Sequence, residues 1–460
     1  MKKGRTINVA NGETGIVTLK RITSPMIANQ ISRRGLLLGL ALWLMVWGSY
    51  NTDIERLNSP DFPASAFDLL HGLRSLSSLL AAYIAIIILF AQRSLLMKLF
   101  QGPLGFLALY TLVGIASSIS LSHEPLTALY WAAQYGSVLI VLWAISVVSN
   151  SPRSSFLSLI NLNWIFAGIL TIGLFLFFIF QPGAISSLAA GDFVGARPYE
   201  GLAGIPHEME ILGMVSTRPT GLGRYAGVVA IVAFTMFLHS KKQSKFIWFF
   251  LFLIFFSILI FSQSRTAIVA FLISALLILW LQSRSKFLLI LGTPFSLFLL
   301  GLTGFYQAFY IYLEEEMPFV FTLSGRTVGT WPEAWQLFLS SPLLGYGFHA
   351  DRIFLEGQHT HNAFLHALVQ TGLIGTVSFI FAFIWAWIIL FRLLKRPLIQ
   401  KSGKPYLIVI AGVLAYLTVR TITESTGAFF GTEWLILAPL LAYLTTLNKR
   451  KFSLNQMAFK

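Results

Sequence analysis

The sequence predicts an all-α, polytopic integral membrane protein with about 12 transmembrane helices. Three observations predict this fold class: 56% of the 460 residues are hydrophobic, only 11% are charged, and the apolar residues gather in long runs. An ordinary soluble domain has about 25% charged residues, so the composition excludes a soluble globular enzyme. The chain also has no cysteine, which excludes disulfides, thiolate metal sites and cysteine nucleophiles.

Apolar runs of nearly transmembrane length recur along the whole chain. A helix needs roughly 20 mostly apolar residues to cross the hydrocarbon core of a bilayer. Twelve runs bounded by charged or turn residues come close to this length, at residues 35–50, 70–90, 102–121, 126–148, 156–181, 222–239, 245–262, 266–283, 287–306, 362–390, 405–421 and 433–447. The polar stretches between them are too short to fold as a separate soluble domain.

The runs divide the chain into three parts. Residues 1–34 are longer and more polar than the n-region of a signal peptide, so we expect a cytoplasmic segment followed by a span that stays in the membrane. Residues 35–447 would form a single transmembrane domain and residues 448–460 a cytoplasmic tail. Two long periplasmic loops are expected at residues 182–221 and, between spans nine and ten, at residues 307–361. Long loops are usually functional.

The basic residues predict that both termini are cytoplasmic. An even number of spans places the termini on one side, and lysine and arginine concentrate in cytoplasmic loops. Every lysine is then cytoplasmic, and the nine periplasmic basic residues are all arginines: Arg56, Arg74, Arg197, Arg218, Arg224, Arg265, Arg326, Arg352 and Arg420. The net charge of +15 thus reports mainly on topology, and we expect a lipid bilayer and no nucleic acid as a partner.

Three of these arginines stand where a helix end attracts anions. Spans six, eight and ten would run inward, so that their N-termini, with free N–H groups, face the periplasm. Arg218 and Arg224 precede or open span six, and Arg265 opens span eight. A cation is unfavourable there unless an anion lies between it and the helix end, and a guanidinium grips phosphate in a bidentate fork. The pattern indicates a phosphate site, although any single arginine could instead form a surface ion pair.

Arg420 is the contrasting case. It lies at the outward C-terminal end of span eleven, where the helix dipole favours a cation, and Glu424 follows one turn later. We expect a structural ion pair between these two residues.

His361 is the candidate general base. It opens span ten, with Thr360 as a plausible N-cap, and the positive helix end favours a neutral imidazole that can accept a proton from a hydroxyl. An interfacial histidine bonded to a loop would give the same pattern.

Two metal sites are weaker alternatives. Histidine is a common metal ligand, and four histidines lie close together in the chain: His349, His359, His361 and His366. None of them forms a helical His-x-x-x-His pair. Asp53 and Glu55 could chelate a divalent ion, but two acids two residues apart are a weak signal. We therefore expect neither a metal nor another cofactor.

The segment Thr330-Trp-Pro-Glu333 predicts a short helix that begins with a capping box and has proline in its first turn. The apolar side chains of this helix fall on one face: Trp331, Trp335, Phe338 and Leu339. It is expected to lie at the outer membrane–water interface.

Between Arg218 and Ile380 a series of short motifs resembles the O-antigen ligase and O-antigen polymerase superfamily of bacterial membrane proteins, glycosyltransferases of the GT-C type. The motifs are Arg218-Pro-Thr-Gly221, Ser264-Arg265-Thr266, Ser324-Gly325-Arg326 with Trp331 following, Ser341-Pro-Leu-Leu-Gly345-Tyr-Gly347, His361-Asn362-Ala-Phe-Leu and Gly372-Leu-Ile-Gly375. Each fragment alone is weak. Their order and the two long outer loops make the resemblance more specific.

The resemblance implies an activity and roles for particular residues. A periplasmic site in the bacterial inner membrane would transfer a glycan from undecaprenyl diphosphate to an acceptor sugar, without a metal or nucleotide. His361 would be the base, and the diphosphate would bind to arginines, namely Arg218, Arg265, Arg326 and, as an alternative to Arg218, Arg224. Asn362, Gly325 and Gly345 would support the site. The sequence departs from the family after Gly221, where many members have Pro-Asn, so either Arg218 or Arg224 could align with the functional arginine.

The resemblance leaves the acceptor open. It could be a lipid A core, as for an O-antigen ligase, a growing polysaccharide, as for a polymerase, or a protein hydroxyl, as for an O-oligosaccharyltransferase. A polysaccharide or lipid flippase is the alternative from another class. Flippases keep ionisable groups or broken helices near the middle of the bilayer, whereas here the charges gather at span ends.

Overall fold

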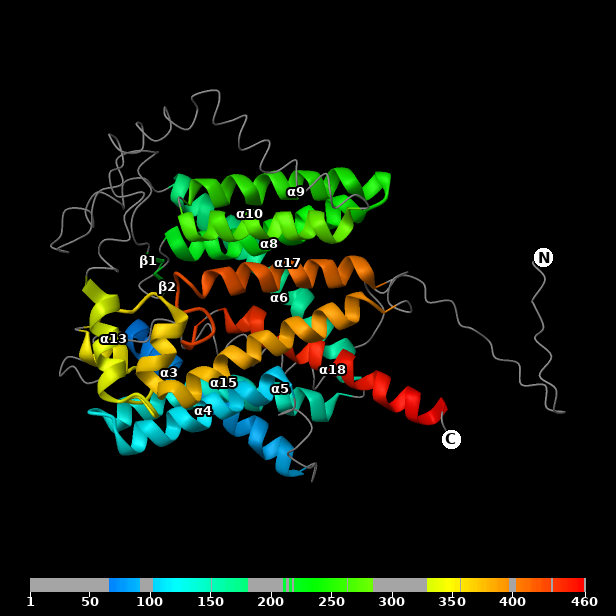
Figure 1. Cartoon of the computed structure of the whole chain (residues 1–460). Helices are drawn as coiled ribbons and strands as arrows, with labels where there is room; N and C mark the ends of the chain where they lie inside the picture. The colour runs from blue at the N-terminus through cyan, green and yellow to red at the C-terminus, as the bar shows by residue number, and fades with distance from the viewer. Residues whose placement is uncertain are drawn as a thin grey trace.

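The computed structural model describes most of the chain, and the described part is a bundle of long helices lying side by side (Figure 1). The described residues are 66–91, 102–149, 151–180, 210–211, 215–216, 219–262, 264–283, 329–355, 357–396, 403–431 and 433–458. Two short strands, β1 (Glu210–Ile211) and β2 (Val215–Ser216), pair antiparallel. Apart from this pair, the described regular structure is helical, as the sequence predicts.

Ten of the twelve predicted spans fall on described helices. These helices are α3 (Ala66–Ala91), α4 (Pro103–Ser120), α5 (Pro125–Val148), α6 (Pro152–Phe180), α8 (Pro219–His239), α9 (Lys242–Phe261), α10 (Arg265–Gln282), α15 (Ala363–Leu394), α17 (Lys404–Arg420) and α18 (Trp434–Ala458). Two shorter helices, α13 (Trp331–Ser340) and α14 (Ala350–Phe354), precede α15. The runs at residues 35–50 and 287–306 lie outside the described residues.

Six of the helices are long and apolar enough to cross a membrane. They are α4, α5, α6 up to Gly173, α8 from Gly221, α9 and α15. Shorter apolar helices cover Leu76–Phe90 and Thr266–Gln282. The phenylalanine-rich helix α9 leaves Phe246, Ile247 and Phe250 uncovered, as expected of a helix that faces lipid. The chain is thus a multi-pass membrane protein, whereas the number of 12 spans and their orientation stay predictions.

Helix α17 joins the three helices whose starts carry the predicted site residues. It contacts α8, α10 and α15, which correspond to predicted spans six, eight and ten. All residues from Leu407 to Leu417 are buried, so α17 is covered by protein rather than by lipid over most of its length. In Figure 1 it lies between the pair α8 and α10 on one side and α15 on the other. Beyond α15 lies α4, which packs against it.

The two ends of the bundle differ. Helix α13 and the β1–β2 pair lie at one end, and the C-terminal end of α18 lies at the other (Figure 1). The predicted outer loop, residues 307–361, contains α13, whereas α18 leads into the predicted cytoplasmic tail. The predicted outer loop and the predicted cytoplasmic tail therefore lead to opposite ends of the bundle.

A sharp kink interrupts α15 at Gly372, whose φ of 56° and ψ of −161° are not helical. The kink breaks the helical hydrogen-bond ladder, and residues 341–347, here called the docking turn, replace the missing bonds. The amides of Leu373 and Ile374 donate to the docking turn at Pro342 and Leu343, over 2.8 and 3.3 Å. Inside a membrane such backbone groups must find partners in the protein, since lipid offers none.

The docking turn also donates two hydrogen bonds back to α15. The amides of Tyr346 and Gly347 donate to the carbonyls of Val369 and Gln370, over 2.9 and 2.8 Å. The backbone can approach this closely because position 345 is glycine. Its φ is +67°, and a Cβ there would come within 2.6 Å of the Gln370 carbonyl carbon. Two glycine-containing motifs of the sequence, at 341–347 and 372–375, are thus one packed unit.

Candidate functional site

His361 lies immediately before the cap of α15 and faces Glu424. Its φ is 48°, in the left-handed region that non-glycine residues rarely adopt. Its Nδ1 lies 3.5 Å from Glu424 Oε2, and 35% of its side chain is exposed. The ring is thus fixed on one side by a carboxylate and open on another, which is an arrangement suited to a general base.

Asn362, not Thr360, caps α15. The Asn362 side-chain oxygen accepts hydrogen bonds from the amides of Phe364 and Leu365, over 2.9 and 3.0 Å. The expectation that Thr360 is the cap is therefore wrong. Asparagine satisfies the free amides at a helix start as well as threonine does, and the extended backbone of Asn362 places its side chain to do so. Thr360 instead holds Trp331, because its carbonyl accepts from the Trp331 indole N–H over 2.7 Å.

The segment after α17 is tied to the start of α15. The amide of Ala363 donates to the carbonyl of Thr421, and the Asn362 side-chain amide donates to the carbonyl of Ile422, both over 2.9 Å. The amide of Glu424 closes a turn onto the Arg420 carbonyl over 2.8 Å. These bonds hold Glu424 beside His361.

The predicted pair of Arg420 and Glu424 is not formed as expected. The Glu424 carboxylate lies against His361, and no hydrogen bond joins it to the guanidinium of Arg420. Helix α17 does end at Arg420, so the position at its C-terminus is confirmed. The chain turns out of the helix directly afterwards, which directs the next acid toward α15 rather than back along α17.

Arg224 lies in the second turn of α8 and forms an ion pair with Glu433, with Nη1 3.1 Å from Oε1. Both side chains are nearly buried. The backbone at the start of α8 is also held by α17, because the Tyr416 hydroxyl lies 3.1 and 3.3 Å from the carbonyls of Gly223 and Arg224. The starts of α8 and α15 therefore both attach to the C-terminal end of α17 and the chain that follows it.

Four other predicted site residues lie partly or wholly outside the described residues. Arg218, Gly325 and Arg326 lie wholly outside the described residues. Arg265 is the first residue of α10, as predicted, but its side chain is not described. Gly345 is described and belongs to the docking turn, so its place is structural support under α15.

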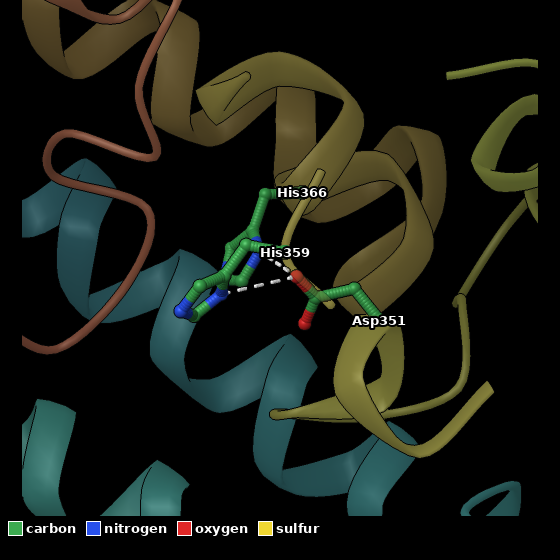
Figure 2. Close-up of side chains that lie close together, drawn as sticks. All are labelled: Asp351, His359 and His366. Atoms are coloured by element: carbon green, nitrogen blue, oxygen red, sulfur yellow. Dashed lines mark hydrogen bonds and ion pairs between the residues drawn. The ribbon is translucent and has the colours of Figure 1, made fainter. Parts of the chain in front are cut away.

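The structure reveals a buried cluster that the sequence did not indicate. Asp351, in α14, accepts a hydrogen bond at Oδ2 from Nδ1 of His366 over 2.7 Å, and Nδ1 of His359 lies 3.7 Å from the same oxygen. Figure 2 shows the rings of His359 and His366 on one side of the Asp351 carboxylate, with both nitrogens directed at it. Asp351 and His366 are completely buried. No spacing in the sequence signals the cluster, since Asp351 precedes these histidines by 8 and 15 residues.

The cluster holds the Asp351 carboxylate charged and the His359 ring neutral. Burial alone would raise the pKa of Asp351, but the charge and hydrogen bonds of His366 and His359 outweigh it and keep this pKa well below its usual range. Burial lowers the pKa of His359 to about 4, and burial and the nearby Arg352 lower the pKa of His349 to about 3. At neutral pH His349 and His359 are therefore uncharged.

These three side chains could hold a metal ion, since one ligand atom from each lies within 4.8 Å of the others. They differ from the four-histidine site considered above. His361 faces Glu424 instead, and the ring of His349 stacks on Trp131 with centroids 4.9 Å apart. The guanidinium of Arg352 hydrogen bonds to His359, and a cation at this place opposes a bound dication. The contacts favour a hydrogen-bonded carboxylate–histidine unit over a metal centre.

Helix α13 has the predicted position without the predicted cap. Thr330 has helical φ and ψ values and its side chain accepts no capping hydrogen bond, so the capping box is wrong. Trp335 and Leu339 are exposed, as expected at a membrane interface, whereas Trp331 turns inward to the Thr360 carbonyl. The bond of Trp331 links α13 to the residue next to His361.

Comparisons with known proteins match this part of the chain. Residues 250–380 match the O-antigen ligase family. This stretch runs from α9 into α15 and contains Arg265, Arg326 and His361. The chain is also 34% identical over 119 residues to the exopolysaccharide production protein ExoQ of Rhizobium meliloti (strain 1021). That match covers 22% of this chain and 26% of ExoQ, so the two share about a quarter of their lengths. The family match and the likeness to ExoQ both support the resemblance to the O-antigen ligase and polymerase superfamily that the sequence motifs indicate.

Proposed function

We propose that the protein is a membrane glycosyltransferase of surface polysaccharide biosynthesis. It transfers a glycan from undecaprenyl diphosphate to a sugar hydroxyl at the periplasmic face of the bacterial inner membrane, as an O-antigen ligase does. The single observation that carries the proposal is the pair of His361 and Glu424, with 3.5 Å between Nδ1 and Oε2, at the start of a membrane-spanning helix. The match of residues 250–380 to the O-antigen ligase family supports the same class of reaction.

In this proposal His361 acts as the base. With Nδ1–H directed at Glu424, Nε2 carries the lone pair that accepts the proton of the acceptor hydroxyl. The hydroxyl oxygen attacks the anomeric carbon of the donor, the bond from that carbon to the diphosphate oxygen breaks, and the configuration inverts. Glu424 keeps the ring in this tautomer and stabilises the imidazolium that forms, so that Glu424 is a positioning residue.

The arginines stabilise the leaving diphosphate. Negative charge develops on it as the bond to the sugar breaks, and preorganised donors in a water-poor site lower the energy of that state. We assign this role to Arg218, Arg265 and Arg326. Arg224 is the alternative to Arg218, and its ion pair with Glu433 fixes the position of its guanidinium. Since the glycan donor is already activated, no metal or nucleotide is required by this chemistry.

A polymerase is the second candidate, because the printed name of the relative concerns exopolysaccharide production. Ligase, polymerase and protein O-oligosaccharyltransferase share the donor and differ in the acceptor. A flippase is less favoured. In the spans that the structure describes, charged side chains lie within about two turns of a helix end, and the groups gathered around His361 are at one end of the bundle.

The test is a reconstituted reaction with the full chain in liposomes. A defined undecaprenyl-diphosphate glycan is supplied with a lipid A core acceptor, with a second lipid-linked glycan, or with an acceptor peptide, and the product is identified by mass spectrometry. A product with an inverted linkage supports the proposal, and the acceptor that reacts decides between its forms. Movement of the donor across the membrane without any product would overturn it in favour of a flippase.

A chelator arm tests the metal alternatives in the same assay. We expect EDTA to leave the rate unchanged. If EDTA abolished transfer and zinc or magnesium restored it, the metal-independent mechanism would be wrong. Asp351→Asn and Asp53→Asn would then show whether the ion binds at the buried cluster or in the first outer loop.

A further inference from the structure

Arg420 is a buried cation whose guanidinium forms no hydrogen bond or ion pair within the part of the chain that the structure describes. Its side chain is completely buried, and it is among the largest fully buried side chains. Its three guanidinium nitrogens, Nε, Nη1 and Nη2, have no hydrogen-bond partner among the described residues. A buried charge carries a large desolvation cost unless it is paired, so such a group indicates a missing anion.

The described contacts of Arg420 are too weak to explain its burial. The guanidinium carbon lies 5.8 Å from the centre of the Tyr416 ring, which is a long cation–π contact. The C-terminal dipole of α17 favours a cation, but this effect is small beside the cost of burial. The Tyr416 hydroxyl is also close enough to the guanidinium for a weak side-chain interaction, but one neutral oxygen cannot satisfy its five donors.

The surroundings of Arg420 connect it to both parts of the candidate site. One turn before it, Tyr416 reaches the backbone of Gly223 and Arg224 at the start of α8. One turn after it, Glu424 faces His361. Arg420, Arg224 and Glu433 all act electrostatically on the Tyr416 hydroxyl. Arg420 therefore lies on the short stretch of α17 and its following turn that joins the predicted base to the start of α8.

We propose that Arg420 binds the diphosphate of the lipid donor, as a further anion-binding residue beside Arg224. This inference rests on the proposed function and adds to it a residue that lies outside the segment matched to the O-antigen ligase family. The guanidinium of Arg224 is balanced by Glu433, whereas that of Arg420 has no such carboxylate.

The proposal predicts opposite effects on stability and on binding. Arg420→Met keeps the length of the side chain and removes the charge, so the unliganded protein should be at least as thermally stable as wild type. If the role of Arg420 were only structural, the same substitution would instead lower the thermal stability of the unliganded protein. With a diphosphate present, Arg420→Met should lose the stabilisation that the ligand gives to wild type, and glycan transfer should fall by about 100-fold.

The experiment measures thermal unfolding of the full chain in zwitterionic nanodiscs by intrinsic fluorescence, for which the 12 tryptophans provide the signal. Farnesyl diphosphate is the lipid probe, inorganic pyrophosphate the free-anion probe, and farnesol the uncharged control. Arg392→Met is the matched variant, because Arg392 also lies near a helix C-terminus over an aromatic ring, 5.9 Å from the centre of the Trp385 ring. Arg420→Lys, which keeps the charge without the fork, serves if Arg420→Met does not fold.

Wild type and Arg392→Met are expected to gain stability with farnesyl diphosphate and not with farnesol, while Arg420→Met gains none and Arg420→Lys gains less than wild type. A response to pyrophosphate alone that is lost in Arg420→Met would place a free phosphate group, rather than the lipid donor, at this residue and would overturn the assignment to the donor. Equal shifts in wild type, Arg420→Met and Arg420→Lys would overturn the inference and leave the proposed function standing. If no protein responded to farnesyl diphosphate, donor binding itself would be refuted, and the inference with it.

Discussion

His361 Nδ1 lies 3.5 Å from Glu424 Oε2, although 63 residues separate the two in the chain. The contact joins the N-terminal end of α15 to the turn that follows α17. It gives the proposed base a carboxylate partner, as general bases commonly require for a fixed ring orientation.

Loss of this pair is expected to remove catalysis without removing the fold. His361→Ala should lower glycan transfer by about 100-fold to 10,000-fold, which is the usual contribution of a general base. Glu424→Gln should lower the maximal rate by a smaller factor and leave the KM for the lipid-linked donor unchanged, because the amide can still hold the ring but cannot stabilise the imidazolium. Steady-state transfer rates in liposomes measure both.

His239→Ala is the control for these variants. His239 is the last residue of α8, where Nδ1 lies 2.9 Å from the carbonyl of Thr235, far along the helix from Arg224. The His239→Ala variant should transfer glycan at the wild-type rate. Wild-type activity in His361→Ala would remove the base assignment, and an unchanged rate in Glu424→Gln would reduce the pair to a structural contact.

Arg265 is expected to act through the shape of its side chain as well as its charge. Arg265→Lys should lose most of the activity, since an ammonium cannot form the two parallel hydrogen bonds by which a guanidinium binds phosphate. Transfer kinetics over a range of donor concentrations are the measurement. Arg392→Lys, at the inner end of α15, should behave as wild type. Unchanged kinetics in Arg265→Lys would contradict diphosphate recognition at this residue.

The orientation in the membrane can be tested with a single introduced cysteine, because the chain has none of its own. Gln358 and Gln243 are both exposed, and the predicted topology places them on opposite sides of the membrane. In intact cells with a permeable outer membrane, a membrane-impermeant maleimide should label Gln358→Cys and not Gln243→Cys. Labelling in the reverse sense would invert the topology and place His361 in the cytoplasm.

Thermal stability is expected to fall as the pH is lowered from 7.5 to 5. The pKa values of His359 and His349 are lowered by burial to about 4 and about 3, below the usual value of 6.5. Below pH 6.5 the unfolded chain therefore takes up protons that the folded chain does not, and each such histidine costs up to about 1.4 kcal/mol per pH unit. The pKa of Asp351 lies below this range, so its carboxylate stays ionised throughout it.

His349→Asn should reduce this dependence on pH. Asparagine tolerates the left-handed backbone of position 349, where φ is 68°, and it does not titrate in this range. Between pH 7.5 and 5, the melting temperature of the variant should fall by less than that of wild type. An identical pH profile in wild type and His349→Asn would show that another group causes the fall.

Gly345 is expected to be essential for the packing of the docking turn. Gly345→Ala would bring a Cβ within 2.6 Å of the backbone of Gln370, so we expect a loss of about 1–3 kcal/mol beyond the cost of the positive φ. Gly357→Ala is the matched control, since φ there is +81° and no atom lies within 4 Å of the new Cβ. Melting temperatures of the two variants in detergent give the comparison, and equal losses would contradict tight contact at Gly345.

Hydrophobic length and charge were sufficient to predict the helices. Ten of the twelve predicted runs fall on described helices, because crossing a bilayer demands long apolar segments that are visible without knowledge of their neighbours. Boundaries were less accurate. The predicted tenth span ends four residues before α15 does, because apolar and aromatic residues continue up to Arg392.

The contacts of the candidate site could be predicted only in part. Asn362 and Thr360 are both good caps, and the sequence does not say which one takes the extended backbone that a cap needs. The spacing of Arg420 and Glu424 predicts an ion pair between them. However, α17 ends at Arg420, and the turn that follows directs the Glu424 carboxylate toward α15. The cluster around Asp351 depends on how α14 folds back against α15, which is a tertiary property without a local signature.

The kink at Gly372 also has a consequence for biogenesis. When α15 enters the membrane, the amides of Leu373 and Ile374 and the carbonyls of Val369 and Gln370 find hydrogen-bond partners in residues 342–347. Those residues are synthesised first and, in the predicted topology, must already be across the membrane when α15 arrives. The translocated loop thus supplies the hydrogen-bond partners that this helix needs to complete its insertion. Substitutions that disrupt residues 342–347 would therefore reduce membrane integration of the chain as well as its activity.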